Sequence, residues 1–386
     1  MAHWFFWMSA GWLCYVWIGY PTALVLLSLK WRFRPQFSED YDPLVSVLIA
    51  ARNEEKDIAW KLAQTLSWNY PVERLEVLVG SDASTDGTDD AIRLVTDPRM
   101  TFVRSEVRSG KIRILNRLAS LARGEILFFT DANTHIDRDC LRKMVRHFAD
   151  PRVGCVTGIQ RNLDGTDAST ITTGSNAYVE YESALAALEA RVGSVLVCDG
   201  SIYCLRKSLF SDLDPDLAND LEHPIRAGAA GAAILYEPQA QSFERCTSAV
   251  HEELSRRRRI AAQGALGMWR LRRDLRGLRL WQFVSRKFLR WLTPIPLIIA
   301  LVTSFLLRQE QYFATCLIVQ MLFYLLAFAG AWQNKQSQAR SLFRVPFTLL
   351  TATVAVFFGV FDACCGKRFA TWNIAALSRG IPRGSR

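Results

Sequence analysis

The chain lacks the cysteine pattern of a disulfide framework or a zinc site. Its nine cysteines are an odd number at irregular spacing, and no Cys-x-x-Cys pair occurs among the 386 residues. Disulfide frameworks and zinc sites both need paired cysteines at regular spacing. We therefore predict reduced, mostly buried thiols in a protein that faces the cytosol.

Net positive charge is absent outside one segment. The net charge is +10, yet residues 256–290 hold twelve Lys or Arg and one acid, Asp274, a local sum of +11. The rest of the chain therefore sums to −1. This distribution disfavours a generally basic nucleic-acid binder, and we predict no nucleic-acid partner. With 50% hydrophobic residues and a mean hydropathy of +0.07, the chain is not disordered and is expected to contain membrane segments.

Long apolar runs are absent between residues 35 and 290 but occur on both sides of that stretch. Residues 4–29 form 26 uncharged residues, followed at once by Lys30, Arg32 and Arg34. The run lacks the basic start of a signal peptide and exceeds the length of its apolar core, so we predict a retained transmembrane helix. The basic flank predicts that the following residues lie in the cytoplasm. We expect this helix to anchor the protein in the plasma membrane.

Three more apolar runs follow the basic segment, at 291–307, 312–332 and 345–361. The middle run has 21 residues, and the other two have 17 each, which is at the short end for a span. Four full spans that start outside would leave the C-terminus outside, whereas the tail bears Lys and Arg without any acid, which favours the inside. Either one short segment is re-entrant or interfacial, or the tail breaks the rule.

These features divide the chain into five parts. We predict an N-terminal transmembrane anchor at 1–34, a water-soluble domain at 35–265, basic amphipathic interfacial helices at 266–290, transmembrane segments at 291–365 and a basic tail at 366–386. Within the interfacial part, apolar residues recur at helical spacings among the arginines. Such helices lie in the headgroup layer, so anionic membrane lipids are their expected partners.

The water-soluble domain alternates strands and helices. The predicted elements are strands at 44–50, 75–80, 101–104 and 125–130, with helices at 57–68 and 111–122 between them. This alternation indicates an α/β fold with a mainly parallel sheet. Polar clusters follow three of the strands, at Arg52–Glu54, Asp82–Asp86 and Asp131–Asn133. Ligands of such sheets bind beyond the carboxyl ends of the strands, so these clusters predict a binding site.

In order and spacing, the segments resemble the family 2 glycosyltransferases, in particular the membrane-embedded polysaccharide synthases. The matching segments are Val45–Glu54, Gly80–Thr88, Gly110-Lys111, Phe129–Asn133, Gly200–Leu209, Ala218–Leu221 and Arg256–Ile260. The resemblance covers about residues 42–262 and includes the membrane arrangement. It implies a GT-A fold and an inverting, metal-dependent hexosyltransferase that uses a nucleotide-sugar donor.

The resemblance also implies roles for individual residues. Those bordering the nucleotide-sugar would be Ala51, Arg52, Glu54, Asp82, Lys111, Asp131 and Ala132. Among them, Asp82 would accept a hydrogen bond from the base, typically uracil. Asp131-Ala132-Asn133 stands where the family has Asp-x-Asp, so Asp131 and Asn133 would ligate Mg²⁺ or Mn²⁺. Asn133 replaces a carboxylate, but an amide oxygen is also a ligand for hard cations.

The second half of the resemblance concerns the acceptor. Asp220 would be the general base, a role worth typically about 10²–10⁴-fold in rate. Asn219, Arg256 and Arg259 would border the diphosphate and the acceptor. Residues 256–260 occupy the place of the Gln-x-x-Arg-Trp motif of processive synthases, with the Arg kept at 259 and the Gln and Trp lost. The lost Trp disfavours processive polymerisation.

Structural readings compete with these roles. Asp82–Asp86 could cap a helix, Asp131–Asn133 could form an Asx turn, and Asp220 could be a solvated acid at a helix start. We expect structural roles for His135 and His223.

The leading prediction is an inverting glycosyltransferase that acts on a lipid-linked or growing glycan at the cytoplasmic membrane face. One alternative is a processive synthase that couples polymerisation to export, with export or assembly partners. Another is a non-catalytic membrane partner that binds a nucleotide-sugar. A nucleotidyltransferase would need a Gly-rich loop after the first strand, and residues 50–54 contain no glycine.

Overall fold

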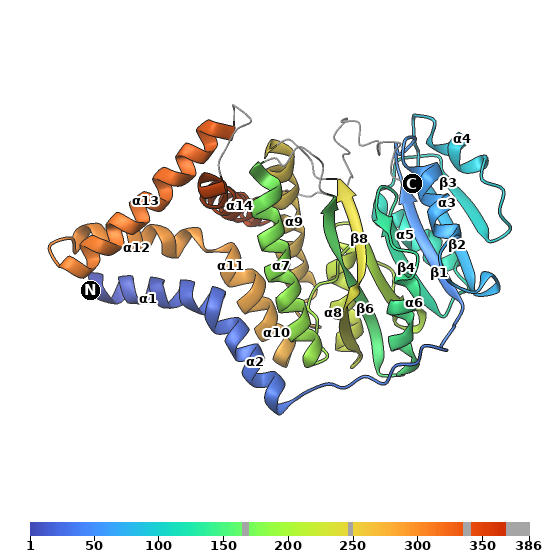
Figure 1. Cartoon of the computed structure of the whole chain (residues 1–386), viewed down its shortest axis with the longest axis horizontal. Coiled ribbons are helices and arrows are strands. Elements are labelled where there is room, and N and C mark those ends of the chain that lie inside the picture. The colour runs from blue at the N-terminus through green and yellow to red at the C-terminus, as the bar shows by residue number, and fades with distance from the viewer. Residues whose placement is uncertain (164–169, 246–249, 335–340, 368–386) are drawn as a thin grey trace.

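The protein joins an α/β domain to a set of apolar helices that extend from one side of it (Figure 1). The computed structural model describes residues 1–163, 170–245, 250–334 and 341–367. The strands are β1 Val45–Ala51, β2 Leu75–Asp82, β3 Met100–Ser105, β4 Ile126–Asp131, β5 His135–Ile136, β6 Val153–Leu163, β7 Ile202–Arg206 and β8 Ala233–Arg245.

The helices of the α/β domain are α3 Ile58–Leu66, α4 Thr88–Arg93, α5 Lys111–Leu121, α6 Cys140–Val145, α7 Thr170–Arg191, α8 Asn219–Ala229 and α9 Val250–Arg270. Those of the apolar part are α1 Ala2–Cys14, α2 Tyr20–Lys30, α10 Gly277–Phe283, α11 Leu289–Trp291, α12 Pro294–Leu306, α13 Gln311–Asn334 and α14 Ser341–Cys364. Single π-helical segments, Tyr15–Gly19 and Val284–Phe288, join α1 to α2 and α10 to α11.

The eight strands form one sheet in the order β3-β2-β1-β4-β7-β6-β8-β5. The first four run parallel, whereas β7 is antiparallel to both β4 and β6. The predicted α/β fold with a mainly parallel sheet is therefore confirmed, and the antiparallel β7 marks the boundary between two halves of the sheet.

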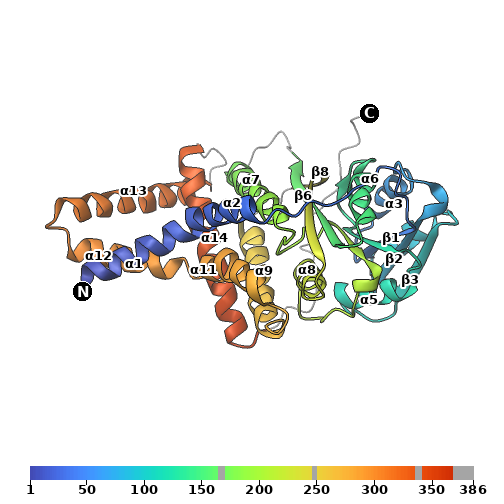
Figure 2. The same ribbon diagram turned by 90° about the horizontal axis from the view of Figure 1, so that it is seen from below.

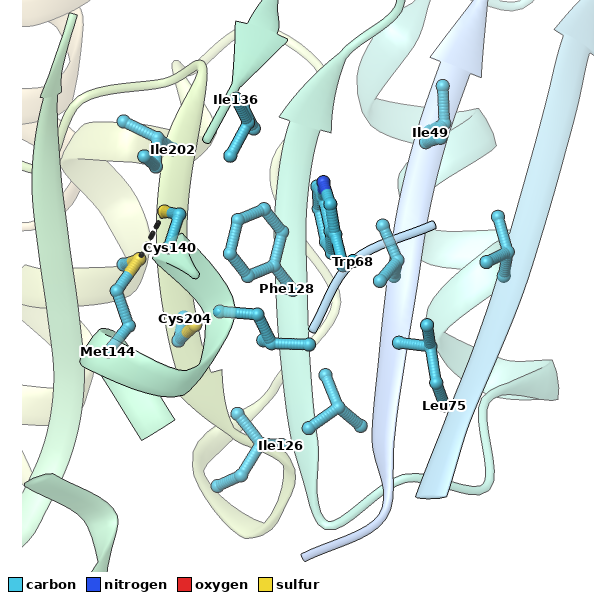
Figure 3. Close-up of a cluster of buried hydrophobic side chains, with 14 of the residues drawn as sticks. Ile49, Trp68, Leu75, Ile126, Phe128, Ile136, Cys140, Met144, Ile202 and Cys204 are labelled. Atoms are coloured by element: carbon cyan, nitrogen blue, oxygen red, sulfur yellow. Dashed lines mark hydrogen bonds between the residues drawn. The ribbon is translucent and has the colours of Figure 1, made fainter. Parts of the chain in front are cut away.

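Each face of the sheet carries its own apolar core. Cys140 and Met144 of α6 lie with Trp68 and Phe128 on one face, as Figure 3 shows, and side chains of α3 belong to the same core. Side chains of α5, α8 and the end of α7 pack on the other face. All seven residues of β1 are buried, as expected for a strand covered on both faces. This double burial leaves the strand ends as the accessible part of the sheet.

The apolar helices include three that are long and apolar enough to cross a membrane within the described residues: Ala2–Lys30, Gln311–Trp332 and Val345–Cys364. A fourth candidate is the bent pair Gly277–Trp291 and Pro294–Leu306, which meet at 56°. The predicted run at 291–307 thus corresponds to α12, whose first turn holds two prolines.

The last apolar helix, α14, runs in a different direction from the others. α1, α12 and α13 extend away from the α/β domain along the long axis of the molecule, whereas α14 lies across them (Figures 1 and 2). It contacts α13 on one side and α7 and α9 of the α/β domain on the other. Lys367 follows α14, and the rest of the predicted tail lies outside the described residues.

Candidate active site

The polar clusters after β1, β2 and β4 meet at one edge of the sheet. In the parallel register, Ala51 pairs with Ser81, and Ala50 pairs with Asp131. Asp82 therefore lies next to the loop that begins at Arg52 and close to the end of β4. The structure thus brings together the three clusters that the sequence predicted to meet.

The loop after β1 is held against the loop after β2. Arg52 Nη1 donates to the carbonyl oxygens of Asp82 at 2.6 Å and of Ala83 at 3.3 Å. The Glu54 backbone N–H donates to Thr88 Oγ1 at 2.8 Å. Asn53 and Ala83 both have positive φ, 53° and 50°, a backbone conformation that residues other than glycine rarely adopt. Strained residues of this kind persist where the surrounding structure enforces them, often at binding sites.

Asp82 is fully buried and shapes the start of α5. Its two carboxylate oxygens accept hydrogen bonds from the backbone N–H groups of Ser109, at 2.5 Å, and Gly110, at 2.9 Å. Gly110 has φ 93°, which favours glycine. These bonds fix Lys111 at the first position of α5. The contact of Asp82 with a base stays a prediction. At the start of α4, where Gly87 is the N-cap residue, Asp86 accepts from Thr88 N at 3.1 Å.

Lys111 and Asp131 form the central ion pair of this edge. Lys111 Nζ lies 2.5 Å from Asp131 Oδ1, and the side chains are 22% and 28% exposed. Below them, the buried Lys61 donates to Thr130 Oγ1 at 3.0 Å and to the Thr134 carbonyl at 2.8 Å. Lys61 therefore supports the loop that carries Asp131-Ala132-Asn133, a role that an isolated lysine on a predicted helix did not reveal. Ala132 belongs to this loop, and its side chain is buried in the apolar core.

Asn133 faces a carboxylate that the sequence did not predict. Asn133 Nδ2 donates to Glu244 Oε1, near the end of β8, at 2.9 Å. Gln160 of β6 donates to the other oxygen of Glu244. The contact joins residues 111 positions apart in the chain, so local pattern alone could not have found it.

Asp220 stands in the first turn of α8, as predicted, and is partly buried. Its backbone carbonyl accepts from Cys198 N at 2.9 Å. Its carboxylate lies beside Gly200, twenty residues earlier in the chain, where an added Cβ would be 3.1 Å from a carboxylate oxygen. The irregular chain between Ser194 and Gly200 therefore positions Asp220.

Burial raises the pKa of the Asp220 carboxyl to about 6. Lys111 and Lys287 oppose this rise, whereas Asp199 and Asp131 add to it. These mutual influences place Asp220 in one electrostatic cluster with the Lys111–Asp131 pair. Asp199 and Lys287 were not predicted from the sequence. Asp199 is held by Ser201 Oγ at 2.7 Å and by Gln160 N at 2.8 Å.

The side chain of Asn219 turns toward the core. It is 5% exposed and donates to Tyr203 OH at 2.8 Å. Tyr203 in turn stacks on Phe129 with ring centroids 4.6 Å apart. Asn219 therefore packs α8 onto the sheet, and its contact with the diphosphate or acceptor stays a prediction.

The four consecutive arginines of α9 point to different partners. Arg259 is partly buried, and its pKa is lowered by burial and by Arg256, while Asp220 and Asp131 act in the opposite direction. Arg257 lies 5.4 Å over the Tyr178 ring, and Arg258 pairs with Asp362 of α14 at 2.5 Å. Arg259 is therefore the member of the run whose charge is influenced by Asp220 and Asp131, and Arg256 is the exposed residue near it. The contact of both with a diphosphate or acceptor stays a prediction.

Both predicted structural histidines lie in packed surroundings. His223 is 1% exposed, bonds Tyr203 OH at 2.8 Å and contacts the Phe129 and Phe210 rings. His135 stacks on Trp60 and bonds Gln64 at 2.7 Å. Neither ring belongs to the charged cluster.

In the predicted interfacial segment 266–290, here called the connector, several charges face protein, and its contact with lipid stays a prediction. Arg286 pairs with Glu189 at 2.5 Å and with Glu182 at 2.7 Å, and Arg290 also pairs with Glu182. Arg270 pairs with Asp214 and Asp216. The sequence displayed the arginines but not their partners, which lie on α7 and before α8. The exposed basic residues of the connector are Arg272, Arg273 and Arg276.

We name the contacts between the connector, α7 and the N-terminal helix the junction. It comprises Tyr20, Glu182, Glu189, Ser194, Gln282, Arg286 and Arg290. Tyr20 OH donates to Glu189, and Gln282 Nε2 donates to the Ser194 carbonyl at 2.7 Å. The junction therefore attaches the apolar helices to the start of the segment that positions Asp220.

The donor set at the end of β4 fits a hard divalent cation. Among the residues the structure describes, no group of three His, Cys, Asp or Glu could hold a metal alone. The Asp131 carboxylate and the Asn133 amide oxygen supply oxygen ligands. The Asn133 Nδ2 atom donates to Glu244. Mg²⁺ is commonly bound by one or two side-chain oxygens with substrate phosphates completing the shell. Asp131 and Asn133 thus suit a cation that arrives with a diphosphate.

Comparison with known proteins identifies a family and relatives that this chain resembles. Residues 46–211 match the family described as "Glycosyl transferase family 2". A beta-monoglucosyldiacylglycerol synthase of Synechocystis sp. is 33% identical over 118 residues, covering 30% of this chain and 25% of the relative. A poly-beta-1,6-N-acetyl-D-glucosamine synthase of Staphylococcus epidermidis is 29% identical over 205 residues, covering 51% and 48%. The chain therefore matches between a quarter and half of the length of these relatives.

A solved structure resembles nearly the whole chain. It is the mannosyltransferase PcManGT from Pyrobaculum calidifontis in complex with GDP-Man and Mn²⁺, with 22% identity and a TM-score of 0.71 over 94% of this chain and 99% of that one. This likeness shows the fold. The predicted GT-A fold and the resemblance to family 2 glycosyltransferases are both confirmed.

Proposed function

We propose that this chain, which carries a family 2 glycosyltransferase domain of the GT-A fold, is a membrane-bound inverting glycosyltransferase. It moves a sugar from a nucleotide-sugar, with UDP the favoured nucleotide, to a lipid-linked or growing glycan acceptor. The observation that carries the proposal is the cluster in which Asp220 faces the Lys111–Asp131 ion pair and Arg259. A base and the binding groups for an anionic leaving group thus lie in one site.

The donor binds along the strand ends in this proposal. The loops at Ala51–Glu54 and Asp82 border the nucleoside, and Lys111 and Arg259 contact the diphosphate. A divalent cation at Asp131 and Asn133 supplies neutralisation of the charge that grows on the leaving nucleoside diphosphate. Arg259 adds charge-assisted hydrogen bonds to the same oxygens.

Asp220 acts as the general base. The acceptor hydroxyl attacks the anomeric carbon from the face opposite the leaving group and loses its proton to the Asp220 carboxylate, which inverts the anomeric centre. A pKa of about 6 leaves this carboxylate mostly ionised at neutral pH yet more basic than an ordinary Asp. This match between pKa and working pH favours general-base catalysis.

The acceptor approaches from the membrane side. Arg259 and Lys287 belong to segments that connect the catalytic domain to the apolar helices, so an acceptor held at the bilayer would reach Asp220 from there. The names of the relatives support both a glycolipid and a polysaccharide product. The second candidate function is processive synthesis, favoured by the polymer-forming relative. Ile260, in the place of the family's Trp, favours single or few additions.

The catalytic domain lies at the cytoplasmic face of the plasma membrane in this proposal. α1–α2, α13 and the bent pair that ends in α12 cross the bilayer, whereas α14, although long and apolar enough to cross, lies along its surface. Three observations support this placement of α14: it runs across the other apolar helices, it packs on α7 and α9, and its Asp362 pairs with Arg258. The exposed Arg272, Arg273 and Arg276 would meet anionic lipids at the same surface.

Activity of a base variant tests the proposed chemistry. Purified protein in detergent, offered a panel of UDP- and GDP-sugars with candidate acceptors, is expected to release nucleoside diphosphate only with Mg²⁺ or Mn²⁺ and an acceptor. Asp220→Asn should lower turnover by at least ~10² because the base is lost, while nucleotide binding persists. Asp212→Asn, at an exposed position in the preceding loop, is the control. Full turnover in Asp220→Asn would favour the non-catalytic partner instead.

The position of the C-terminus tests the membrane placement. Tags at the N-terminus and after residue 386 are compared, in sealed vesicles of known orientation, by their accessibility to protease. We expect the C-terminal tag on the same side as the catalytic domain and the N-terminal tag on the other side. A C-terminal tag on the side of the N-terminus would mean that α14 crosses the membrane.

A further inference from the structure

The carboxylate of Glu244 contacts the asparagine that departs from the family pattern. Glu244 lies on β8 and is partly buried, and its Oε1 accepts from Asn133 Nδ2 at 2.9 Å. Gln160 Nε2, on the neighbouring β6, donates to Oε2. Two amide groups from different elements thus hold this carboxylate in one orientation beside Asp131-Ala132-Asn133.

The contact determines which atom of Asn133 is available to a ligand. An asparagine amide is planar, with one donor nitrogen and one acceptor oxygen on the same carbon. With Nδ2 engaged by Glu244, Oδ1 points away from Glu244. A carboxylate that accepts from an amide N–H also polarises the amide, which increases the negative charge on its oxygen. Asn133 therefore presents a more strongly ligating oxygen than an isolated amide would.

We propose that Glu244 is a positioning residue for a divalent cation, holding Asn133 so that its amide oxygen ligates the ion beside the Asp131 carboxylate. The inference rests on the proposed function, because it assumes the metal–diphosphate at this motif. Asn133 and Glu244 together do what the second carboxylate of Asp-x-Asp does in the family: the amide supplies the ligand and the neighbouring carboxylate supplies the charge. Groups that orient metal ligands in this way commonly change metal affinity by about 10–100-fold when they are removed.

The pairing of the strands does not require this side chain. β6 and β8 pair through their backbones from Val153 to Leu163, with Asn162 opposite Glu244. Glutamine at position 244 has nearly the same shape and keeps that backbone pairing. A purely structural role therefore predicts that Glu244→Gln leaves cation binding unchanged, which separates it from the proposed role.

Cation affinity, measured apart from catalysis, tests the proposal. Mn²⁺ binding to the full-length protein in detergent, with saturating UDP or GDP, is followed by the electron paramagnetic resonance signal of free Mn²⁺. We expect Glu244→Gln to weaken Mn²⁺ binding by about tenfold or more. The double variant Asn133→Asp with Glu244→Gln moves the charge onto the ligand itself, so its affinity should return to within about threefold of the wild type.

The matched control is Glu125→Gln, an exposed position just before β4 and at the opposite end of that strand from Asp131. Melting temperatures verify that all variants are folded. Unchanged Mn²⁺ affinity in Glu244→Gln, or a double variant as weak as the single one, would overturn the proposal. Absence of Mn²⁺ binding to the wild type with nucleotide present would overturn it together with the metal dependence of the proposed function. Binding by the wild type with no effect at 244 contradicts the role of Glu244 alone.

Discussion

Two regions of the molecule bring opposite charges into contact, and they differ in how far the charges are shielded. At the junction, the side chains of Arg286 and Glu189 are 5% and 0% exposed. At the active site, those of Lys111 and Asp131 are 22% and 28% exposed. Glu182 and Glu189 balance Arg286 and Arg290 at the junction. At the candidate active site, burial raises the pKa of Asp220 to about 6, with Lys111 lowering the pKa and Asp131 raising it.

The difference indicates what each set of charges does. Shielded, balanced pairs have no access to a ligand, so those of the junction hold helices of distant sequence together. The pairs at the strand ends remain open to solvent, so a diphosphate and its cation can replace one partner of the Lys111–Asp131 pair. Removing a charge should therefore have opposite effects on stability in the two regions.

The largest effect is expected from Arg286→Met. It leaves the Glu189 carboxylate buried with one partner fewer, and breaking a buried pair in this way costs about 3–5 kcal/mol. Thermal unfolding in detergent should show a clearly lower Tm. Arg93→Met is the control, because the Arg93–Asp90 pair is exposed and such pairs contribute at most about 1 kcal/mol. Equal Tm values for the two variants would remove the distinction between junction and surface pairs.

A smaller effect is expected from pH, acting on Asp220. The base must be ionised, so turnover should rise with pH through about 6 and fall about tenfold between pH 7 and pH 5. The raised pKa means that the folded state favours the neutral carboxyl. The stability that the neutral carboxyl contributes is complete below about pH 4 and is lost as pH rises through 6. Asp220→Asn should therefore raise Tm at pH 8, opposite to Arg286→Met.

A lower Tm for Asp220→Asn at pH 8 would show that Asp220 serves stability like the junction residues. A turnover that is flat between pH 5 and pH 7, measured with donor and acceptor saturating, would instead separate the rate-limiting step from Asp220. The two measurements together tell whether the active site and the junction are distinct in function.

The sequence predicted the meeting of the polar clusters at the strand ends but not the junction, for a geometric reason. Parallel strands place their carboxyl ends at one edge, so Asp82 and Asp131 could be brought together from strand order alone. The partners of Arg286 and Arg290 lie on α7, about a hundred residues earlier in the chain, and no local pattern encodes that packing. Glu244 escaped prediction for the same reason.

Two details of the packing also lay beyond local sequence patterns. The start of α8 turns Asn219 into the core, where Tyr203 OH accepts a hydrogen bond from its amide. The amphipathic spacing of the connector predicts a membrane surface, but a protein surface that carries Glu182 and Glu189 satisfies the same spacing, so periodicity alone cannot distinguish the two.

The short irregular segment between Ser194 and Gly200 has a mechanical consequence. At one end, Gln282 Nε2 of α10 donates to the Ser194 carbonyl. Near the other end, Cys198 N donates to the Asp220 carbonyl. A displacement of α10 would therefore be transmitted to the backbone of Asp220 through a segment of only a few residues.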